Sequence, residues 1–550
     1  MLSGNPWARP SRTPTPATPT LLSQLEELMA DNTSRSGVTY TKAEEGYFEK
    51  RSLKRTAGVW GLWGIGIAAV ISGDFAGWNP GLGVAGWGGL LIATAIIIVM
   101  FFTMIFSIGE MSAAMPHTGG AYSFARAAMG PWGGFITGLA ETIEYVVTTA
   151  VVVLFSAYYL DSIIFELVGF TLSPADGPDL AWIWWIVLYA IFIGLNSLGA
   201  SVGFRFALIV AIISMAVLLV YGIIAFATGS VDFSKLLDIA PTEGNSEFLP
   251  FGVTGILFAL PFAIWFFLGI EELPLAAEEA TNPTKDIPKA SVWGVITLAF
   301  FAILVLFLNP GVTGSAALTE SPGLDEPILV GFRVFLPDSV AAIISAFALI
   351  GLLASLQGIM FAYGRNMYSL SRAGYYPKFL SLTGAKHQTP WVALVVGGVI
   401  GFAILVAVTV VGTVAPDIAG AVNGIILFIA VFGAVISYIM QMASYVILRR
   451  KFPNATRPYS SPTGIPGAIV AGVIAVLAFI GILLAPDFRL AVTTFLVIFV
   501  VGVIIFAVIG RHRLVLSPEE EYALSGGLHG DPETEGYDVM EDEVFGSPKK

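Results

Sequence analysis

Apolar runs long enough to cross a membrane alternate with short polar stretches along almost the whole chain. About 20 apolar residues suffice for a helix to cross the ~30 Å hydrocarbon layer. Helices are expected rather than a barrel, because each helix satisfies its own backbone and alternating barrel patterns are missing. The pattern predicts twelve spans, near 58–80, 89–114, 131–158, 181–199, 204–228, 252–276, 290–309, 339–362, 391–413, 420–447, 465–485 and 488–510.

Composition agrees with this pattern. The 550 residues are 56% hydrophobic and 12% charged, and the mean hydropathy is +0.81. Such values are typical of a chain that lies mostly in lipid. The predicted fold is therefore an all-α integral membrane protein. The absence of cysteine from the sequence excludes disulfides, thiolate nucleophiles and cysteine metal sites.

Basic residues indicate the orientation, since cytoplasmic loops retain Lys and Arg. With the N-terminus inside, all but three of the 27 Lys and Arg lie in the tails and inner loops. The exceptions are Lys235, Arg333 and Arg489. Both termini are therefore expected in the cytoplasm, and the protein is expected to be a multi-pass protein of the plasma (inner) membrane. The net charge of −12 comes from acidic outer loops and the acidic C-terminal tail, and says little about partners.

Two predicted spans carry glycine and acidic residues near their middle. The first contains "ISGDFAG" around Asp74, and the sixth contains "FFLGIEELP" around Glu271. Gly and Pro weaken a helix, and an ionisable group at the bilayer centre costs at least ~2.5 kcal/mol unless it faces protein or water. Each span is thus predicted to be two half-helices around an unwound turn. The alternative is a Gly/Pro kink in a tightly packed helix, with the acids paired structurally.

The two interruptions occur at corresponding positions, in the first of spans 1–5 and the first of spans 6–10. This arrangement is typical of transporters built from five-plus-five inverted repeats with broken helices 1 and 6. Unwound turns leave free amides and carbonyls at the midplane, which suits a small ion or polar solute. The expected divisions are a cytoplasmic tail (1–55), the first repeat (56–230), the inverted repeat (250–450), helices 11 and 12 (464–512) and an acidic cytoplasmic tail (513–550).

The third span carries Glu141 and Glu144 in "GLAETIEYVV". Glu144 lies ~20 Å along a helix that starts at Pro131, close to the midplane. Glu141 is one turn nearer the cytoplasm on roughly the same face. Either could carry a coupling proton. Equally, either could simply hydrogen-bond to a neighbouring helix.

Three separated motifs resemble the amino acid/polyamine/organocation transporter superfamily. They are "FSIGEMSAAMPHTGGAYSFARAAMGPWGGFITG" (106–138), "AAEEATNPTKDIPKA" (276–290) and "GRNMYSLSRAGYYPKFLS" (364–381). They resemble the inner ends of the second, sixth and eighth helices of that family, and the resemblance covers roughly residues 55 to 450. "VISGDFAGWNPGL" and "GPWGGFITG" look most similar to the ethanolamine permease branch.

The resemblance also implies a binding site. Amino acid carriers of this family usually hold a carboxylate on a Gly-x-Gly turn in helix 1, whereas this chain has Ser72, Gly73 and Asp74 there. An aspartate repels a carboxylate and pairs with a cation, which favours an amine that lacks a carboxylate. The expected substrate-binding residues are Ser72, Gly73, Asp74, Phe75, Glu144, Tyr145, Trp265, Phe266, Phe267, Gly269 and Glu271, with Trp78 as a further wall. For each aromatic residue, plain packing or lipid contact is the alternative.

Coupling is less determined by the sequence. Proton-coupled relatives often carry a lysine midway along helix 5, where this chain has Ser214. Lysine-type coupling is therefore not favoured. Sodium near helices 1 and 8, protons on Glu141 or Glu144, substrate exchange and facilitated uptake stay open. No organic cofactor or resident metal is expected.

Charged residues in the inner loops are spaced as an ion-pair network that could open and close with alternating access. Its expected members are Glu110, Arg126, Glu278, Glu279, Lys285 and Arg372. The alternative is a set of solvated loop charges worth under ~1 kcal/mol per pair.

Other functional classes fit the sequence less well. An enzyme is not expected, since there is no cysteine and no H-E-x-x-H motif. A channel lacks a recognisable filter, and a transporter-derived sensor is harder to separate. The favoured function is a secondary transporter of a small amine, ethanolamine first, that lies in the bilayer and binds no nucleic acid. A neutral or cationic amino acid is the second choice of substrate, and polyamines or choline come next.

Overall fold

The computed structural model describes residues 37–41, 46–174, 179–320, 326–414, 419–453 and 457–525. The first half contains β1 (Tyr40–Thr41), η1 (Glu49–Arg51), α2 (Val59–Val70), α3 (Ser72–Phe75), α4 (Pro80–Ala114), α5 (Gly120–Val168), α6 (Trp182–Ser197), α7 (Ala200–Ala227), η2 (Phe233–Leu237), α8 (Gly252–Trp265) and η3 (Ile270–Glu279). The second contains α9 (Pro283–Thr313), η4 (Ala317–Thr319), α10 (Pro327–Arg333), α11 (Asp338–Arg372), η5 (Lys378–Ser381), α12 (Trp391–Val414), α13 (Ala419–Lys451), α14 (Gly464–Leu484), η7 (Pro486–Phe488), α15 (Arg489–Val508), η8 (Gly510–His512), β2 (Leu514–Val515) and α16 (Pro518–Ser525).

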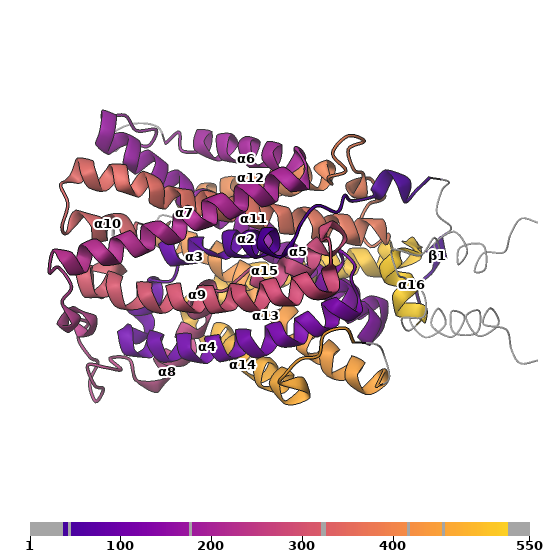
Figure 1. Cartoon of the computed structure of the whole chain (residues 1–550). Coiled ribbons are helices and arrows are strands. Elements are labelled where there is room, and N and C mark those ends of the chain that lie inside the picture. Colours follow the sequence, from indigo (N-terminus) through magenta and orange to yellow (C-terminus); the bar gives the residue numbers. More distant parts are fainter. Residues whose placement is uncertain are drawn as a thin grey trace, which may run out of the picture.

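The long helices run side by side as one bundle (Figure 1). Within the described residues, ten helices are long and apolar enough to cross a membrane, and two shorter apolar ones span Val59–Phe75 and Trp182–Ser197. Each predicted span falls on one of these helices. Large apolar side chains such as Ile223 and Val399 point outward, as expected where lipid covers the surface. The all-α membrane fold is therefore confirmed.

Two long helices bend at glycines. In α4, Gly86 has a φ of 68°, and in α5, Gly130 has a φ of 79° and precedes Pro131. A side chain at Gly86 would also collide with Pro250, whose Cγ lies 2.3 Å from the position of a Cβ. The bend at Gly130 separates a short amphipathic segment from the membrane span, which accordingly begins at the predicted Pro131.

Helix packing places the interrupted helices in the centre of the bundle. α5 packs along α11 and α13, and α4 packs along α8 and α9. α2 lies among α7, α9 and α11, and it also contacts η3. The first and sixth predicted spans, α2–α3 and α8–η3, are thus surrounded by other helices.

Both ends of the described chain meet at one face of the bundle, which we call the terminal face. There β1 pairs in parallel with β2, with Tyr40 opposite Leu514 (Figure 1). α16 follows β2 and packs against α5. Residues 514–525 are therefore docked, whereas the sequence predicted an acidic tail from 513 onward. The rest of that tail, residues 526–550, and residues 1–36 of the N-terminal tail lie outside the described residues.

Candidate functional site at the two broken helices

The first interruption lies at the end of the predicted stretch "ISGDFAG", at Ala76, and not around Asp74. Ser72–Phe75 keep one helical turn, α3, because the amide of Asp74 donates to the carbonyl of Ile71 (3.1 Å) and that of Ala76 to Ser72 (3.0 Å). The chain then becomes extended at Ala76, with φ −162° and ψ 160°. The indole N–H of Trp265 donates to the freed Ala76 carbonyl at 3.0 Å. The unwound part thus lies a few residues beyond the predicted Ser72, Gly73 and Asp74.

The second interruption lies where it was predicted. α8 ends at Trp265, and Gly269 takes a φ of +110°, which favours glycine, before η3 begins. The amide of Gly269 donates to the Glu271 carboxylate at 3.0 Å. Glu271 and Glu272 occupy the first turn of η3 rather than the unwound residues.

The two interruptions contact each other directly. A Cβ at Gly73 would lie 2.4 Å from the carbonyl oxygen of Trp265, so any larger residue would push the two breaks apart. Ser355 of α11 fixes the first break from the other side. Its hydroxyl donates to the Ala68 carbonyl (2.8 Å) and accepts from the Ser72 amide (3.0 Å). Backbone groups of both breaks therefore gather at one place.

Asp74 is buried without a partner. Its side chain is 1% exposed, and neither carboxylate oxygen has a hydrogen-bond partner among the described residues. The salt bridges found among the described residues do not include Asp74. An isolated buried carboxylate is strongly unfavourable, so Asp74 is available for a cation or a hydrogen-bond donor.

A cluster of four carboxyl groups lies beside η3, which we call the glutamate cluster: Glu141 and Glu144 of α5, and Glu271 and Glu272 of η3. All four are buried, and they act on one another electrostatically. Neither carboxylate oxygen of Glu272 has a hydrogen-bond partner in the described part of the chain, and Glu144 has none there other than the carboxyl group of Glu271. Such a group of like charges requires protons or a bound cation.

Glu141 differs from the other members of the glutamate cluster. It accepts from Asn366 of α11 (3.0 Å), Ser437 of α13 (3.3 Å) and the Tyr145 hydroxyl (3.4 Å). These hydrogen bonds join α5 to α11 and α13, which corresponds to the structural alternative for this residue. Glu144 points to no such partner and corresponds better to a ligand-binding or coupling role.

The structure thus brings together part of the predicted site. Glu144 and Glu271 interact with each other, and the hydroxyl groups of Tyr145 and Tyr438 interact electrostatically with both. Asp74 does not join them. The sequence grouped three carboxylates in one site, whereas the structure has one carboxylate at the first break and a separate cluster at the second.

The predicted aromatic residues surround the breaks and are buried. Trp78 stacks on Phe266, with ring centroids 5.6 Å apart. Phe267 stacks on Phe101 at 5.1 Å. Phe75 packs against Gly351, and its carbonyl accepts from the Tyr159 hydroxyl (3.1 Å). The contacts therefore fit both walls of a closed site and ordinary packing.

Ser214, the residue aligned with the coupling lysine, bonds within its own helix. Its hydroxyl donates to the Val210 carbonyl at 2.7 Å, and the side chain is buried in α7. This contact is typical of a serine in a membrane helix.

Two ion pairs near the terminal face join α11 to η3, the segment that follows the second break. Arg372 of α11 donates to Glu278 of η3 at 2.5 and 2.9 Å. Arg365, also of α11, donates to Glu279 at 2.8 and 3.1 Å. The Arg365 pair is fully buried, whereas the Glu278 side chain of the Arg372 pair is 15% exposed. Both pairs join α11 to η3. Arg372 and Glu278, two of the expected members of the network, thus pair with each other.

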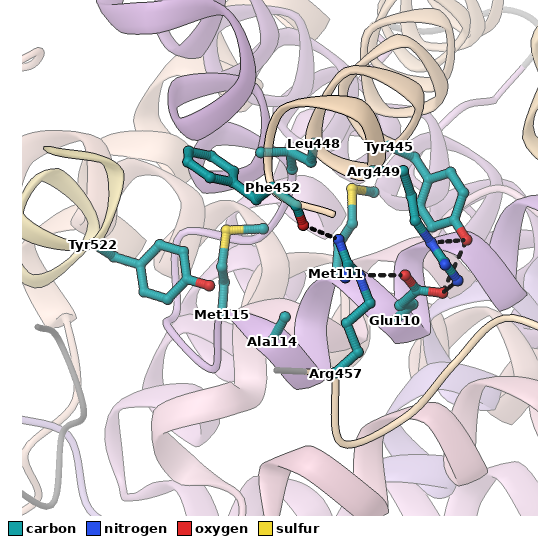
Figure 2. A pocket seen from close by; sticks show the side chains of 10 residues that line it. All are labelled: Glu110, Met111, Ala114, Met115, Tyr445, Leu448, Arg449, Phe452, Arg457 and Tyr522. Atoms are coloured by element: carbon teal, nitrogen blue, oxygen red, sulfur yellow. Dashed lines mark hydrogen bonds and ion pairs between the residues drawn. The ribbon is translucent and has the colours of Figure 1, made fainter. Parts of the chain in front are cut away.

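Two other predicted members have partners that the sequence did not indicate. Glu110 accepts from Arg449 (2.6 Å) and Arg457 (3.0 Å), as Figure 2 shows. Arg126 pairs with Glu520 at 2.7 Å. Lys285 is exposed on the surface. The expected single network is therefore a set of separate clusters.

Sequence reasoning missed several functional candidates. Arg365 lies inside the quoted 364–381 motif, so a basic residue at the end of a span was a usable signal. Glu520 follows "SP", a sequence that often begins a helix. Tyr438 gave no signal, since a tyrosine in a span usually packs.

Comparison with known proteins agrees with this architecture. A family model described as "Amino acid permease" matches residues 61–515. The branched-chain amino acid permease BcaP of Bacillus subtilis (strain 168) is 25% identical over 85% of this chain and 96% of its own length. The gamma-aminobutyric acid permease of the same organism is 28% identical over 60% of this chain and 68% of its own length.

A third relative is the lysine-specific permease LysP of Lactococcus lactis subsp. cremoris (strain MG1363). It is 27% identical over 56% of this chain and 61% of its own length. These relatives are transporters and not enzymes, as expected for this chain, while the ethanolamine branch stays a prediction. The family model covers the broken helices and most of the terminal face, so the chain belongs to the amino acid permease family.

Proposed function

We propose that this permease is a secondary transporter of a small organic amine, with ethanolamine as the favoured substrate. The observation that carries the proposal is the unpartnered carboxylate of Asp74, buried at the first broken helix. A protonated amine would supply the missing charge and hydrogen bonds. A substrate carboxylate at the same place would meet repulsion.

Alternating access fits the contacts around the breaks. The unit that moves would be α2–α3, α4, α8–η3 and α9, against a scaffold of α5, α6, α11 and α12. Trp78 and Phe266, which stack on each other, would form the gate on the side away from the terminal face. On the terminal side, the pairs of Arg372 and Arg365 with η3 join scaffold to moving unit. These pairs would have to separate for substrate to leave.

The coupling ion is proposed from the glutamate cluster. Glu144 and Glu271 lie on opposite units, α5 and η3, and repel each other when both are charged. A proton held there would be released when η3 moves. Ser214 takes no part in this proposal, and sodium at the first break is the alternative.

The orientation follows from charge. We place the terminal face in the cytoplasm and the chain in the plasma (inner) membrane, because most Lys and Arg lie in the tails and in the loops on that side. With this orientation, substrate released at the terminal face enters the cell.

An amino acid is the second candidate substrate. The relatives named for branched-chain amino acids, lysine and gamma-aminobutyric acid favour it. A cationic amino acid would suit the glutamate cluster, which could hold a side-chain ammonium. In that case Asp74 would not be the counter-ion of the substrate.

Uptake of radiolabelled ethanolamine into proteoliposomes separates the two candidates. Wild type, Asp74→Asn and the control Asp232→Asn, at an exposed loop position, would be compared. Unlabelled alanine, lysine, putrescine and choline would serve as competitors. The proposal predicts saturable uptake that amino acids do not block and that Asp74→Asn abolishes. Blockage by amino acids with an unaffected Asp74→Asn would contradict it.

A further inference from the structure

We propose that α16 is a latch: an acidic segment of the chain that docks in a basic, tyrosine-lined site and holds the terminal face closed. The site is formed by Arg126, Tyr122, Arg372 and Tyr375, and β1 contributes Tyr40. Opening at the terminal face would require that α16 leaves this site. The proposal concerns access at this face and does not depend on the substrate.

Glu520 makes the densest set of contacts. Its carboxylate accepts from Arg126 (2.7 Å) and from the hydroxyls of Tyr40 (2.6 Å), Tyr375 (2.8 Å) and Tyr122 (3.0 Å). Glu520 is 0% exposed. A buried carboxylate with one arginine and three hydroxyl donors has its charge compensated and its oxygens satisfied. This is a specific site for an acidic side chain and not a chance surface contact.

Glu519 connects α16 to the ion pair between Arg372 and Glu278 that joins α11 to η3. One of its oxygens accepts from Arg372 (2.5 Å) and from Ser369 (2.8 Å). The same guanidinium holds Glu278 of η3 at 2.5 Å. Arg372 therefore pairs at once with Glu278 of η3, which is in the moving unit, and with Glu519 of α16. While Glu519 is docked, the charge and position of Arg372 favour the closed pair with Glu278.

Two further contacts set the reach of the segment. β2 ties it to β1 and to the end of α11, where the Val515 amide donates to the Ala373 carbonyl at 2.9 Å. Beyond the two glutamates, the Tyr522 ring meets His117 edge-on, with centroids 5.8 Å apart. Figure 2 shows Tyr522 beside Met115, at the edge of the pocket that holds Glu110. α16 therefore covers the ends of both α4 and α5.

Some buried polar groups between α16 and its site lack hydrogen-bond partners. Arg372 Nε, the second oxygen of Glu519 and the Ser517 hydroxyl have no hydrogen-bond partner within the described residues. α16 is also eight residues long, and a helix of that length is marginal without tertiary contacts. These features suit a segment that detaches and unfolds, and they are less expected of a permanent core helix.

The segment also lies beyond the matched family region. The amino acid permease model ends at residue 515, whereas α16 begins at Pro518. Arg126 and Arg372 lie within that region. The latch thus lies outside the matched region, whereas the arginines that it contacts lie inside it.

Thiol labelling tests the latch, because the chain has no native cysteine to interfere. Ser123→Cys places the thiol behind α16. Ser123 is 3% exposed, its hydroxyl has no hydrogen-bond partner within the described residues, and a Cβ at Gly119 would touch both Ser123 and Glu519. Labelling by a membrane-impermeant maleimide would be followed in nanodiscs, where both faces are accessible.

The double change Glu519→Gln and Glu520→Gln should speed labelling of Ser123→Cys by about tenfold or more, because the closed state loses both charge pairs. Glu243→Gln with Glu247→Gln, at exposed loop positions, is the matched control and should leave the rate unchanged. An unchanged rate in the latch variant, with a monodisperse gel-filtration peak, would overturn the proposal.

A single change guards against misfolding of the double variant. Glu520→Gln removes the carboxylate from Arg126, while Arg372 keeps both Glu278 and Glu519. It should speed labelling by less than the double change does. Equal labelling in parent and Glu520→Gln would also contradict the latch. Neither measurement uses a substrate, so its failure would leave the proposed transport function untouched.

Discussion

The terminal face and the two broken helices both bury carboxylates, but they compensate them differently. At the terminal face, Glu278, Glu279 and Glu520 each contact an arginine within 2.5 to 2.8 Å. At the breaks, Asp74 has no hydrogen-bond partner among the described residues, and Glu144 has none there other than another carboxyl group, that of Glu271. Chemically similar groups in the same bundle are thus paired in one region and unpaired in the other.

This difference separates closing the protein from binding its substrate. A buried ion pair is broken at high cost, because each partner is left uncompensated. Such pairs suit a gate with a defined closed state. An unpaired buried carboxylate lowers stability until a ligand or proton arrives, which suits a functional site. Substitutions at the two regions should therefore change stability in opposite directions.

The largest effect is expected at the terminal face. Glu279→Gln removes the partner of Arg365, whose guanidinium stays buried, and should cost about 3–5 kcal/mol of unfolding free energy. Thermal and denaturant unfolding in one detergent would measure it. A loss below about 1 kcal/mol would mean that these pairs behave like surface pairs. It would contradict the claim that the ion pairs of the terminal face stabilise a closed state.

The matched change at the midplane should have the opposite sign. Glu144→Gln replaces an ionisable group, whose electrostatic neighbours are the carboxyl groups of Glu271, Glu141 and Glu272, by a neutral one. We expect a gain of about 1–2 kcal/mol in the same unfolding assay, together with impaired transport. A clear destabilisation would show that Glu144 is structural, and the two regions would no longer differ in kind.

A smaller effect is expected at Glu110, which is paired but lies nearer to water. Its carboxylate accepts from Arg449, which is 30% exposed, and from the Ser461 amide at 2.8 Å. Glu110→Gln should cost about 1–2 kcal/mol and speed hydrogen exchange at the Ser461 amide. Unchanged exchange there would show that Glu110 does not hold the loop before α14.

The smallest effect is expected at the opposite end of the bundle. Glu166 pairs with Arg333 at 2.7 Å, but both side chains are about a quarter exposed, at 25% and 24%. Glu166→Gln should change stability by less than about 1 kcal/mol, and the change should shrink further in high salt. A large loss would mean that burial is not what separates strong from weak pairs in this chain.

Much of the fold followed from the sequence, because hydrophobic spans and mid-span glycines are local signals. The break at Gly269 lies in its predicted stretch, and the first break lies at the end of its predicted stretch, at Ala76, since α3 keeps its hydrogen bonds. Contacts between distant residues were not predictable in the same way. The pair of Arg126 with Glu520 joins residues 394 positions apart, and an acidic tail normally indicates solvent exposure.

The structure brings some of the predicted site residues together and separates others, for the same reason. Glu144 and Glu271 were expected at the midplane from their position along single helices, and they do interact. The separation of Asp74 from them depends on how α3 turns beside α8, which no spacing in the sequence specifies. The predicted ion-pair network was incomplete for a similar reason. Arg365 lies in a quoted motif, but its partner Glu279 is 86 positions away, and the sequence does not show that the two meet.

The central claim is that Asp74 is kept unpaired for a cationic substrate. Ligand-induced thermal stabilisation of purified wild type and Asp74→Asn tests it directly, with ethanolamine and, as an uncharged analogue, ethylene glycol. Binding to the folded state raises stability by mass action. The account predicts that ethanolamine raises the unfolding temperature of wild type, that ethylene glycol does not, and that Asp74→Asn loses the response while being at least as stable without ligand. An equal response to ethanolamine in both proteins would contradict it.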